Sequence, residues 1–263
     1  IYKLYDKDPG RILIRHNQRD KHFFDLYLLD IETREQRSIA KGNAEIVKWI
    51  IDPDDSSGKV IGTVKKTHKG YQFSSRSSSE NTFDLTYEYS LEEYFSVASY
   101  DADNNRLWAL SNRNRDKIAV VTIDLNTMQE KVVLENKRVD ITSLTTHPKT
   151  QRPIYAVSVP DYVEYSLLDN NFVEEIALFK KTVNSAFSIE SVDRDLRFLT
   201  IQQYDDKGYE YLLYDRTNQT LDSLAKSPVA KYASTFSSTT PFQFNSRDGL
   251  AINGYLSLPT DLT

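Results

Sequence analysis

Two adjacent glutamates are the residues of this sequence best suited to bind a charged ligand. Glu92 and Glu93 stand directly before a run of strand-forming residues, 94–98. An ammonium group between two carboxylates would make charge-assisted hydrogen bonds, which are shorter and stronger than neutral ones. The same two side chains could instead be solvated glutamates at the start of a strand. Taken by itself, the sequence favours the second interpretation and keeps the first as a hypothesis.

Histidine and cysteine give no indication of a metal site. The two histidines nearest in sequence, His16 and His22, are six positions apart with Asp20 between them, which is not a zinc-binding spacing. Cysteine is absent, so disulfides and thiolate ligands are excluded, and the redox compartment stays open. We expect surface or strand-end positions for all four histidines, His16, His22, His68 and His147. We expect no metal and no cofactor.

The elements that must position these residues follow a repeat. Short apolar runs recur at steps of 48, 47, 47 and 44 residues, beginning at Ile12, Val60, Leu107, Ile154 and Phe198. A second apolar set keeps a similar interval; its members are Val47, Phe95, Ile141 and Phe187. A set of aspartates follows the same repeat; its members are Asp30, Asp124, Asp169 and Asp215. Periods of 20 to 50 residues mark solenoids, propellers or arrays. The aspartates each end a strand and enter a turn, where they can accept backbone N–H bonds, so we interpret them as structural.

One repeat, residues 94–134, shows what each copy contains. Four runs rich in β-branched and aromatic residues are separated by turn-forming residues such as those at 101–105 and 112–117, and such runs are typical of strands. No stretch of twelve or more residues shows helical spacing. We therefore predict an all-β fold, a β-propeller of four-stranded blades within residues 1–235. Five blades are visible, near 11–45, 46–92, 93–139, 140–185 and 186–230.

Composition argues against two kinds of partner. The formal net charge is −5, and the basic residues are scattered, whereas nucleic acids are bound by a concentrated basic face. No apolar run approaches the roughly 20 residues that span a membrane. The only methionine is Met128, so we expect that the N-terminus of a longer protein, with any signal peptide, has been removed.

The last residues depart from the repeat. Residues 241–246 alternate apolar and polar side chains, Asp248 and Gly249 supply a turn, and 250–259 return, which predicts a hairpin outside the blades. This stretch resembles the "RDG…GYL..P" hairpin that opens the α/β-hydrolase domain in the prolyl oligopeptidase family of serine peptidases. Residues 236–263 would then be a linker and the opening hairpin of a domain absent from this chain, and the C-terminus also looks cut.

Three further stretches resemble the bacterial acylaminoacyl- and dipeptidyl-peptidase-like branch of that family. Residues 49–52 are similar to its "W.vD" strand, residues 111–125 to its "SNrgrD…l.Dl" blade, and residues 211–216 to its "yyLYDR" strand. The resemblance covers nearly the whole chain. It implies a propeller that gates and orients short peptides for a hydrolase domain, with Glu92 and Glu93 binding the substrate's amino terminus.

The chain departs from the family in lacking its catalytic elements. The family nucleophile lies in a G-x-S-x-G elbow, and no pair of the eight glycines brackets a serine in this way; Val60 lies midway between Gly58 and Gly62. No catalytic residue can be assigned, and we expect the chain alone to be inactive. The alternatives are a free-standing binding or scaffold propeller and a carbohydrate-active propeller, which would need converging carboxylates.

The resemblance also bears on assembly and compartment. Family propellers usually have seven or eight blades, so either roughly two N-terminal blades have been removed, which would leave an open arc, or the five blades close in an atypical way. An open arc leaves two bare sheet edges, and exposed edges recruit other chains, so we expect edge pairing or a dimer. Bacterial relatives are often exported, which favours the periplasm over the cytoplasm, although the sequence itself leaves the compartment open.

Overall fold

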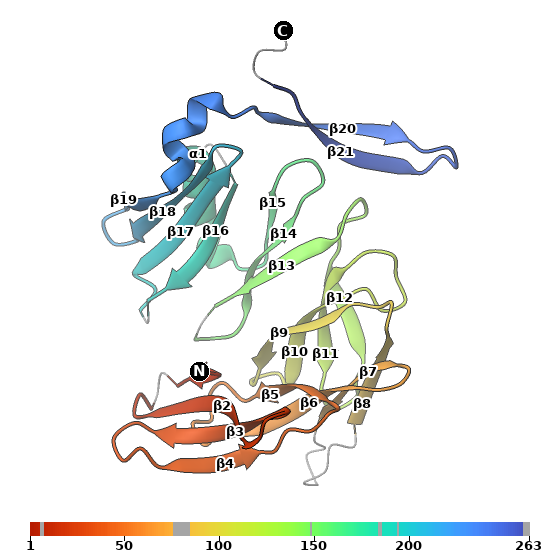
Figure 1. Ribbon diagram of the computed structural model, residues 1–263, viewed down its shortest axis with the longest axis vertical. Helices are drawn as coiled ribbons and strands as arrows, with labels where there is room; N and C mark the ends of the chain where they lie inside the picture. Colours follow the sequence, from red (N-terminus) through yellow and green to blue (C-terminus); the bar gives the residue numbers. More distant parts are fainter. Residues whose placement is uncertain (6–7, 76–84, 148, 184–185, 194, 260–263) are drawn as a thin grey trace. The chain divides into compact units, whose positions relative to one another are not determined.

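The computed structural model describes residues 1–5, 8–75, 85–147, 149–183, 186–193 and 195–259 (Figure 1). These residues divide into two units, Ile1–Ala156 and Val157–Thr263. Within the described ranges no helix is long and apolar enough to cross a membrane.

The first unit contains three four-stranded antiparallel sheets, each built from strands in sequence order. The first sheet comprises β1 (Lys3–Leu4), β2 (Arg11–Asp20), β3 (Phe23–Asp30) and β4 (Gln36–Ala40). The second comprises β5 (Ile46–Ile51), β6 (Val60–Lys66), β7 (Gly70–Ser75) and β8 (Leu85–Ser90). The third comprises β9 (Phe95–Asp101), β10 (Arg106–Ser111), β11 (Ala119–Asp124) and β12 (Glu130–Leu134).

A three-stranded sheet follows, made of β13 (Ile141–Thr146), β14 (Pro153–Ser158) and β15 (Glu164–Leu167). The two units divide within β14. The second unit then contains a fourth four-stranded sheet, of β16 (Ala186–Val192), β17 (Phe198–Asp205), β18 (Gly208–Asp215) and β19 (Thr220–Lys226). A 3₁₀ segment, η2 (Pro228–Thr235), leads to the hairpin of β20 (Thr239–Asn245) and β21 (Ala251–Ser257).

The sequence repeat corresponds to one sheet, which confirms the predicted all-β class. Each of the five apolar runs used to define the period lies in the second strand of a sheet, namely β2, β6, β10, β14 and β17. The second apolar set lies in the first strands β5, β9, β13 and β16. Because strand pairing joins sequence neighbours throughout, one period of the sequence builds one sheet.

The recurring aspartates form the turns that were predicted for them. Asp30, Asp124 and Asp215 are the last residues of β3, β11 and β18. Each accepts hydrogen bonds from the backbone N–H groups two and three residues later, at 2.8–3.3 Å. The residue four positions after each aspartate has positive φ, between 53° and 62°. Asp169 lies two residues beyond β15 and accepts from the N–H of Asn171 at 2.9 Å.

One element contradicts the sequence analysis, which found no helical spacing. After η1 (Asn170–Phe172), the helix α1 (Val173–Thr182) stands where the fourth repeat would have its last strand (Figure 1). Four buried apolar residues spaced 4, 3 and 4 apart form one helical face; they are Phe172, Ile176, Phe179 and Val183. The ring of Phe179 packs edge-on against Phe187 and Tyr214, at 5.6 and 5.0 Å between centroids. The apolar face covers only twelve residues and occurs once in the chain, at a place where the repeat predicts a strand.

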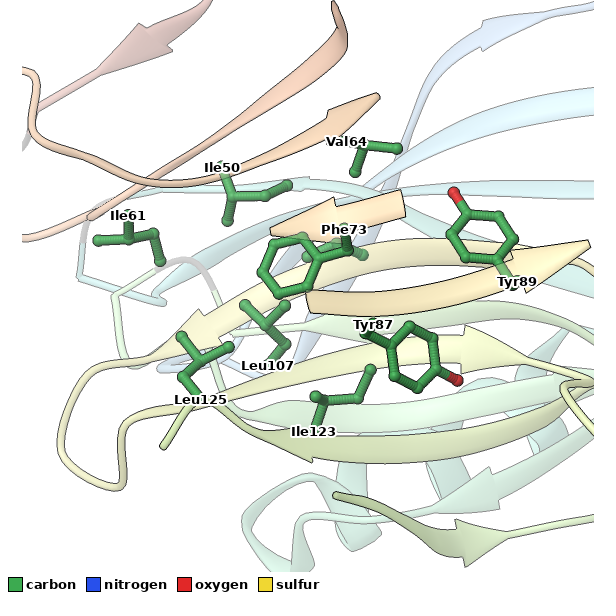
Figure 2. Packing of buried hydrophobic residues seen from close by; sticks show 10 residues of the cluster. Ile50, Ile61, Val64, Phe73, Tyr87, Tyr89, Leu107, Ile123 and Leu125 are labelled. Atoms are coloured by element: carbon green, nitrogen blue, oxygen red, sulfur yellow. The ribbon is translucent and has the colours of Figure 1, made fainter. Parts of the chain in front are cut away.

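A large hydrophobic core of the first unit lies between its second and third sheets (Figure 2). Phe73 and Tyr87 from one sheet face Leu107 and Ile123 from the other, and all four are almost completely buried. Burying a side chain of this size contributes about 1.5–3 kcal/mol. Gly62 makes room for this packing, since a Cβ there would lie 2.6 Å from the ring of Phe73.

Hydrogen bonds also join neighbouring sheets of the first unit. The hydroxyl of Tyr2 donates to the carbonyl of Trp49 at 2.6 Å. Lys48 Nζ in β5 donates to the carbonyl of Val97 in β9 at 3.1 Å. Ser99 Oγ in β9 donates to the carbonyl of Gln151 at 2.5 Å. Each bond spans 47 to 52 residues, about one repeat, so it connects one sheet with the next segment along the chain.

The predicted hairpin is present near the C-terminal end of the described residues. β20 and β21 pair in register from Thr239 with Ser257 to Asn245 with Ala251 (Figure 1). Gly249 in the turn has a φ of 84°, a conformation that glycine adopts without steric cost. Opposite Phe242 lies Gly254, where a Cβ would meet the phenyl ring at 2.6 Å. The hairpin exposes large apolar side chains; they are Phe242, Phe244, Leu250, Tyr255 and Leu256.

Candidate functional site

The adjacent glutamates lie in the short link between two sheets. β8 ends at Ser90 and β9 begins at Phe95, so Glu92 and Glu93 occupy the turn between them. Glu93 Oε2 accepts the backbone N–H of Ser90 at 2.7 Å, and its Oε1 accepts the backbone N–H of Asn114 at 3.0 Å. The carboxylate of Glu93 therefore fastens this link to the loop after β10. Glu92 is exposed.

The surroundings of Glu93 favour its ionised form. Burial acts to raise the pKa of Glu93, but the N–H groups of Ser90 and Asn114 and the charge of Arg113 outweigh it. The net result is a pKa below the usual range for glutamate. A carboxylate that is held in place and ionised is a suitable acceptor for a cationic ligand. Its remaining lone pairs can accept further hydrogen bonds.

Glu93 lines a depression of about 800 Å³ bounded mainly by the second sheet. The wall combines cations with carboxylates and aromatic rings; among its residues are Lys65, Lys66, Lys69, Arg113, Glu45 and Glu88. Glu88 Oε1 accepts the side-chain amide of Gln72 at 3.0 Å. The guanidinium of Arg113 lies 4.5 Å from the centre of the Tyr87 ring. Charges of both signs are therefore available around one carboxylate.

A smaller hollow of about 290 Å³ adjoins this depression, and Tyr71, Tyr89 and Glu93 line both. Tyr71 and Tyr89 are stacked with centroids 5.3 Å apart, and Phe95 lies 4.9 Å from Tyr89. Burial raises the pKa of the Tyr89 hydroxyl, so this ring stays neutral in the physiological range. A carboxylate next to aromatic faces can hold an ammonium group together with an apolar side chain.

The structure places the two predicted residues differently. Glu93 lines both hollows, whereas Glu92 is not among the described residues that line either one. The neighbouring contacts of Glu93 could not be read from the sequence, because Asn114 is 21 positions away. The shared role of Glu92 and Glu93 in binding an amino terminus stays a prediction.

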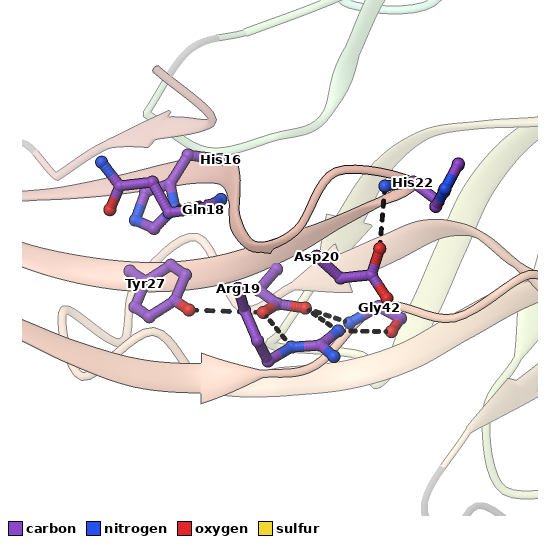
Figure 3. Close-up of polar contacts among 8 residues, drawn as sticks. His16, Gln18, Arg19, Asp20, His22, Tyr27 and Gly42 are labelled. Carbon is purple, nitrogen blue, oxygen red and sulfur yellow. Dashed lines mark hydrogen bonds and ion pairs between the residues drawn. The ribbon is translucent and has the colours of Figure 1, made fainter.

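A second polar cluster, in the first sheet, is structural (Figure 3). Asp25 is fully buried and receives two hydrogen bonds from Arg19, at 2.5 and 2.8 Å, and one from the backbone N–H of Gly42 at 2.7 Å. Tyr27 donates a longer bond of 3.3 Å. The bonds from Arg19, with that from Gly42, lower the pKa of Asp25 to about 2 although burial acts to raise it. The network neutralises a buried carboxylate, as a buried charge requires.

The histidines near this cluster have structural contacts. The His16 ring is stacked on Tyr27 at 4.1 Å and forms a 2.9 Å hydrogen bond with the side chain of Gln36. The backbone N–H of His22 donates to Asp20 at 2.9 Å. Across the described residues, no group of three or more His, Cys, Asp or Glu side chains has a geometry that could hold a metal ion.

Comparison with known proteins finds relatives that match nearly the whole chain. No family model matches the chain. The chain is 24% identical over 261 residues to dipeptidyl aminopeptidase BIII of Pseudoxanthomonas mexicana. This alignment covers 96% of the chain and 37% of the relative. The chain is 21% identical over 262 residues to dipeptidyl peptidase family member 6 of Caenorhabditis elegans, and the alignment covers 94% of the chain and 35% of that relative.

Solved structures agree in fold. A prolyl endopeptidase superposes with a TM-score of 0.62 at 11% identity, covering 98% of this chain and 39% of that one. Prolyl oligopeptidase B from Galerina marginata superposes with a TM-score of 0.56 at 15% identity, and the match covers 99% of this chain and 38% of that one. The fold is thus that of the propeller part of prolyl oligopeptidases. The two curated relatives are a dipeptidyl aminopeptidase and a member of the dipeptidyl peptidase family, and the chain spans a little over a third of the length of each.

Proposed function

We propose that this chain is the non-catalytic propeller region of a serine peptidase. In this proposal residues 1–235 form the propeller, and residues 236–263 are a linker and the opening hairpin of an α/β-hydrolase domain outside the chain. The propeller admits and orients short peptides, and the hydrolase domain cleaves them. The observation that carries the proposal is the similarity of nearly the whole chain to about a third of a dipeptidyl aminopeptidase.

The hairpin supports this division of roles. Its side chains Phe242, Phe244 and Tyr255 are 46–53% exposed, although they are large and apolar. Phe242 and Phe244 lie on one face of the hairpin with their rings stacked 6.1 Å apart, and Tyr255 lies on the other face. Large apolar side chains that are exposed together in this way are typical of an interaction site. In the proposal it is covered by the hydrolase domain, which begins with this hairpin.

The site around Glu93 supports the peptide ligand. A peptide's amino terminus carries an ammonium group next to its first side chain. Glu93 offers an ionised acceptor, and Tyr71, Tyr89 and Phe95 offer aromatic faces beside it. In the proposal Glu92, one position away and exposed, supplies the second carboxylate when the peptide is bound. Anchoring the amino terminus in this way would restrict cleavage to the end of a peptide.

The chemistry of the proposal lies outside this chain. Acyl transfer by a Ser-His-Asp triad needs an activated serine, a base and an oxyanion hole, and the 263 residues contain no G-x-S-x-G elbow. The contribution of the propeller is exclusion of large substrates and orientation of small ones. Holding a reactant in the correct geometry lowers the entropic barrier of the reaction.

A fluorophosphonate probe, which labels activated serines, tests the proposal directly. The probe is applied to this chain and to the longer protein that also contains the segment following Thr263. Labelling of the longer protein alone is the expected result. Labelling of this chain would refute the assignment of a non-catalytic role, and labelling of neither would favour a free-standing binding propeller.

A further inference from the structure

A third hollow, of about 550 Å³, runs along β5 and β9 in the first unit, and we call it the cationic pocket. The described residues that line it include three cationic side chains, Lys3, Arg15 and Lys48, and neither aspartate nor glutamate. This composition is unusual in a chain whose formal net charge is −5. A pocket lined by one sign of charge concentrates ligands of the opposite sign.

Lys48 is held in place but keeps donors for a ligand. Its Nζ uses one N–H for the carbonyl of Val97 at 3.1 Å, and an ammonium has three. The side chain stays partly accessible, yet burial of the amine lowers the pKa of Lys48. No carboxylate of the described chain forms an ion pair with it. A bound anion would therefore supply the counter-charge that the protein does not.

Arg15 is positioned by aromatic rings instead of by a carboxylate. Its guanidinium lies 5.9 Å from the centre of the Tyr2 ring and 5.5 Å from that of Phe24. Tyr2 is itself fixed by its hydrogen bond to the carbonyl of Trp49. The structure describes no ion pair for Arg15, so the planar donors that suit a carboxylate remain available.

The rest of the wall is apolar or already hydrogen-bonded. The ring of Trp49 packs edge-on against Tyr2 at 6.4 Å, and Val97 contributes an aliphatic surface. The hydroxyl of Ser99 is occupied by the carbonyl of Gln151. Strong donors at fixed positions next to apolar walls suit an organic acid with an apolar side chain better than a bare inorganic anion.

We propose that the cationic pocket binds the carboxylate of a short peptide, with Lys48 and Arg15 as its donors. Val47, Lys48 and Val97 line both this pocket and the aromatic hollow at Glu93, so the two adjoin. The two adjoining hollows thus present a negative group, Glu93, and two positive groups, Lys48 and Arg15, as the two ends of a short peptide require. The identity of the ligand as a peptide rests on the proposed function, whereas the binding of a carboxylate does not.

The experiment uses Trp49 as an internal reporter. The chain has two tryptophans, so Trp108→Phe leaves Trp49 as the only one. In this background the tryptophan fluorescence is titrated with N-acetyl-Leu-Phe, which has a free carboxylate, and with its carboxamide. The blocked amine removes any contribution from Glu93. We expect saturable binding of the acid and at least about tenfold weaker binding of the carboxamide, because a charge-assisted contact is lost.

Substitutions assign the donors. Arg15→Met and Lys48→Met should each weaken binding of the acid at least about tenfold. Arg15→Met is the cleaner variant, because Lys48→Met also removes the bond to Val97. Lys131→Met, at an exposed lysine of β12 that lines neither the cationic pocket nor the hollows at Glu93, is the charge-matched control and should leave the affinity unchanged. Thermal melts of all variants check that they are folded.

Three results would overturn the inference. The first is equal affinity for the acid and the carboxamide. The second is wild-type affinity for the acid in the Arg15→Met variant. The third is that inorganic phosphate and acetate displace the acid at the same concentration. Failure of the proposed function gives a different pattern. In that case the fluorophosphonate experiment is negative while the acid still binds to the cationic pocket.

Discussion

Replacing Asp25 by asparagine should make the stability of this protein less dependent on pH. The pKa of Asp25 is about 2 in the folded chain, against 3.8 for an unperturbed aspartate. Each unit of difference corresponds to 1.36 kcal/mol, so ionisation of Asp25 contributes at most about 2.4 kcal/mol near neutral pH. Because the Arg19 side chain is 36% exposed, solvent screening reduces this to about 1–2 kcal/mol.

The direction of the effect follows from the lowered pKa. The stabilisation is fully present above the unfolded pKa of Asp25, and it is lost as the pH falls through about 4 towards 2. Asparagine can still accept the N–H of Gly42 but cannot titrate. The difference in unfolding free energy between wild type and Asp25→Asn should therefore be largest at pH 6–7 and should shrink below about pH 4.

Urea denaturation at pH 3, 4, 5 and 6.5 measures this difference. Other carboxylates titrate in the same range, but their contributions cancel between the two proteins. Asp116, whose side chain is 87% exposed, offers the matched control, and Asp116→Asn should change stability by less than about 0.5 kcal/mol. A difference between wild type and Asp25→Asn that is the same at pH 3 and pH 6.5 would refute the reasoning.

Three other predictions concern the core, the turns and the sheet edges. Phe73→Ala, at a fully buried position between two sheets, should lower the unfolding free energy by about 3–5 kcal/mol in urea titrations, and a loss below 1 kcal/mol would contradict the packing described. Arg34→Gly, at an exposed residue with a φ of 62°, should raise the melting temperature or leave it unchanged, whereas Glu35→Gly beside it should lower it. The isolated chain should show a mass above that of a monomer in light scattering at high concentration, since bare strand edges pair; a monodisperse monomer would count against this.

The fold was predictable because one period of the sequence builds one sheet. Apolar residues such as Leu107 and Phe198 recur in equivalent strands, and the capping role of Asp30 and Asp124 depends only on residues two and three positions away. Information of this kind is local and repeated. Helix α1 escaped prediction because its apolar face occurs once, over twelve residues, in the place where the repeat leads one to expect a strand.

The candidate site was predictable only in part. Glu93 could be predicted as a candidate because a pair of carboxylates is conspicuous in the sequence, but its partner Asn114 comes from the loop between β10 and β11. Nothing in the sequence singles out Arg15 and Lys48, because each resembles an ordinary polar residue within a strand. They line one pocket because neighbouring sheets pack together, and no pattern within a single repeat contains that information.

The hydrogen bonds between sheets have a consequence for how the first unit unfolds. Tyr2 to Trp49, Lys48 to Val97 and Ser99 to Gln151 each connect segments about one repeat apart. Cooperativity in the first unit is therefore transmitted from one sheet to the next, as in a one-dimensional chain of coupled elements. A sheet with a partner on one side has half the coupling energy of a sheet with two. Hydrogen exchange should accordingly be faster in β1–β4, which bonds to one neighbouring sheet, than in β5–β8 and β9–β12, which each bond to segments on both sides. The opening of one sheet should raise the opening rate of its neighbour.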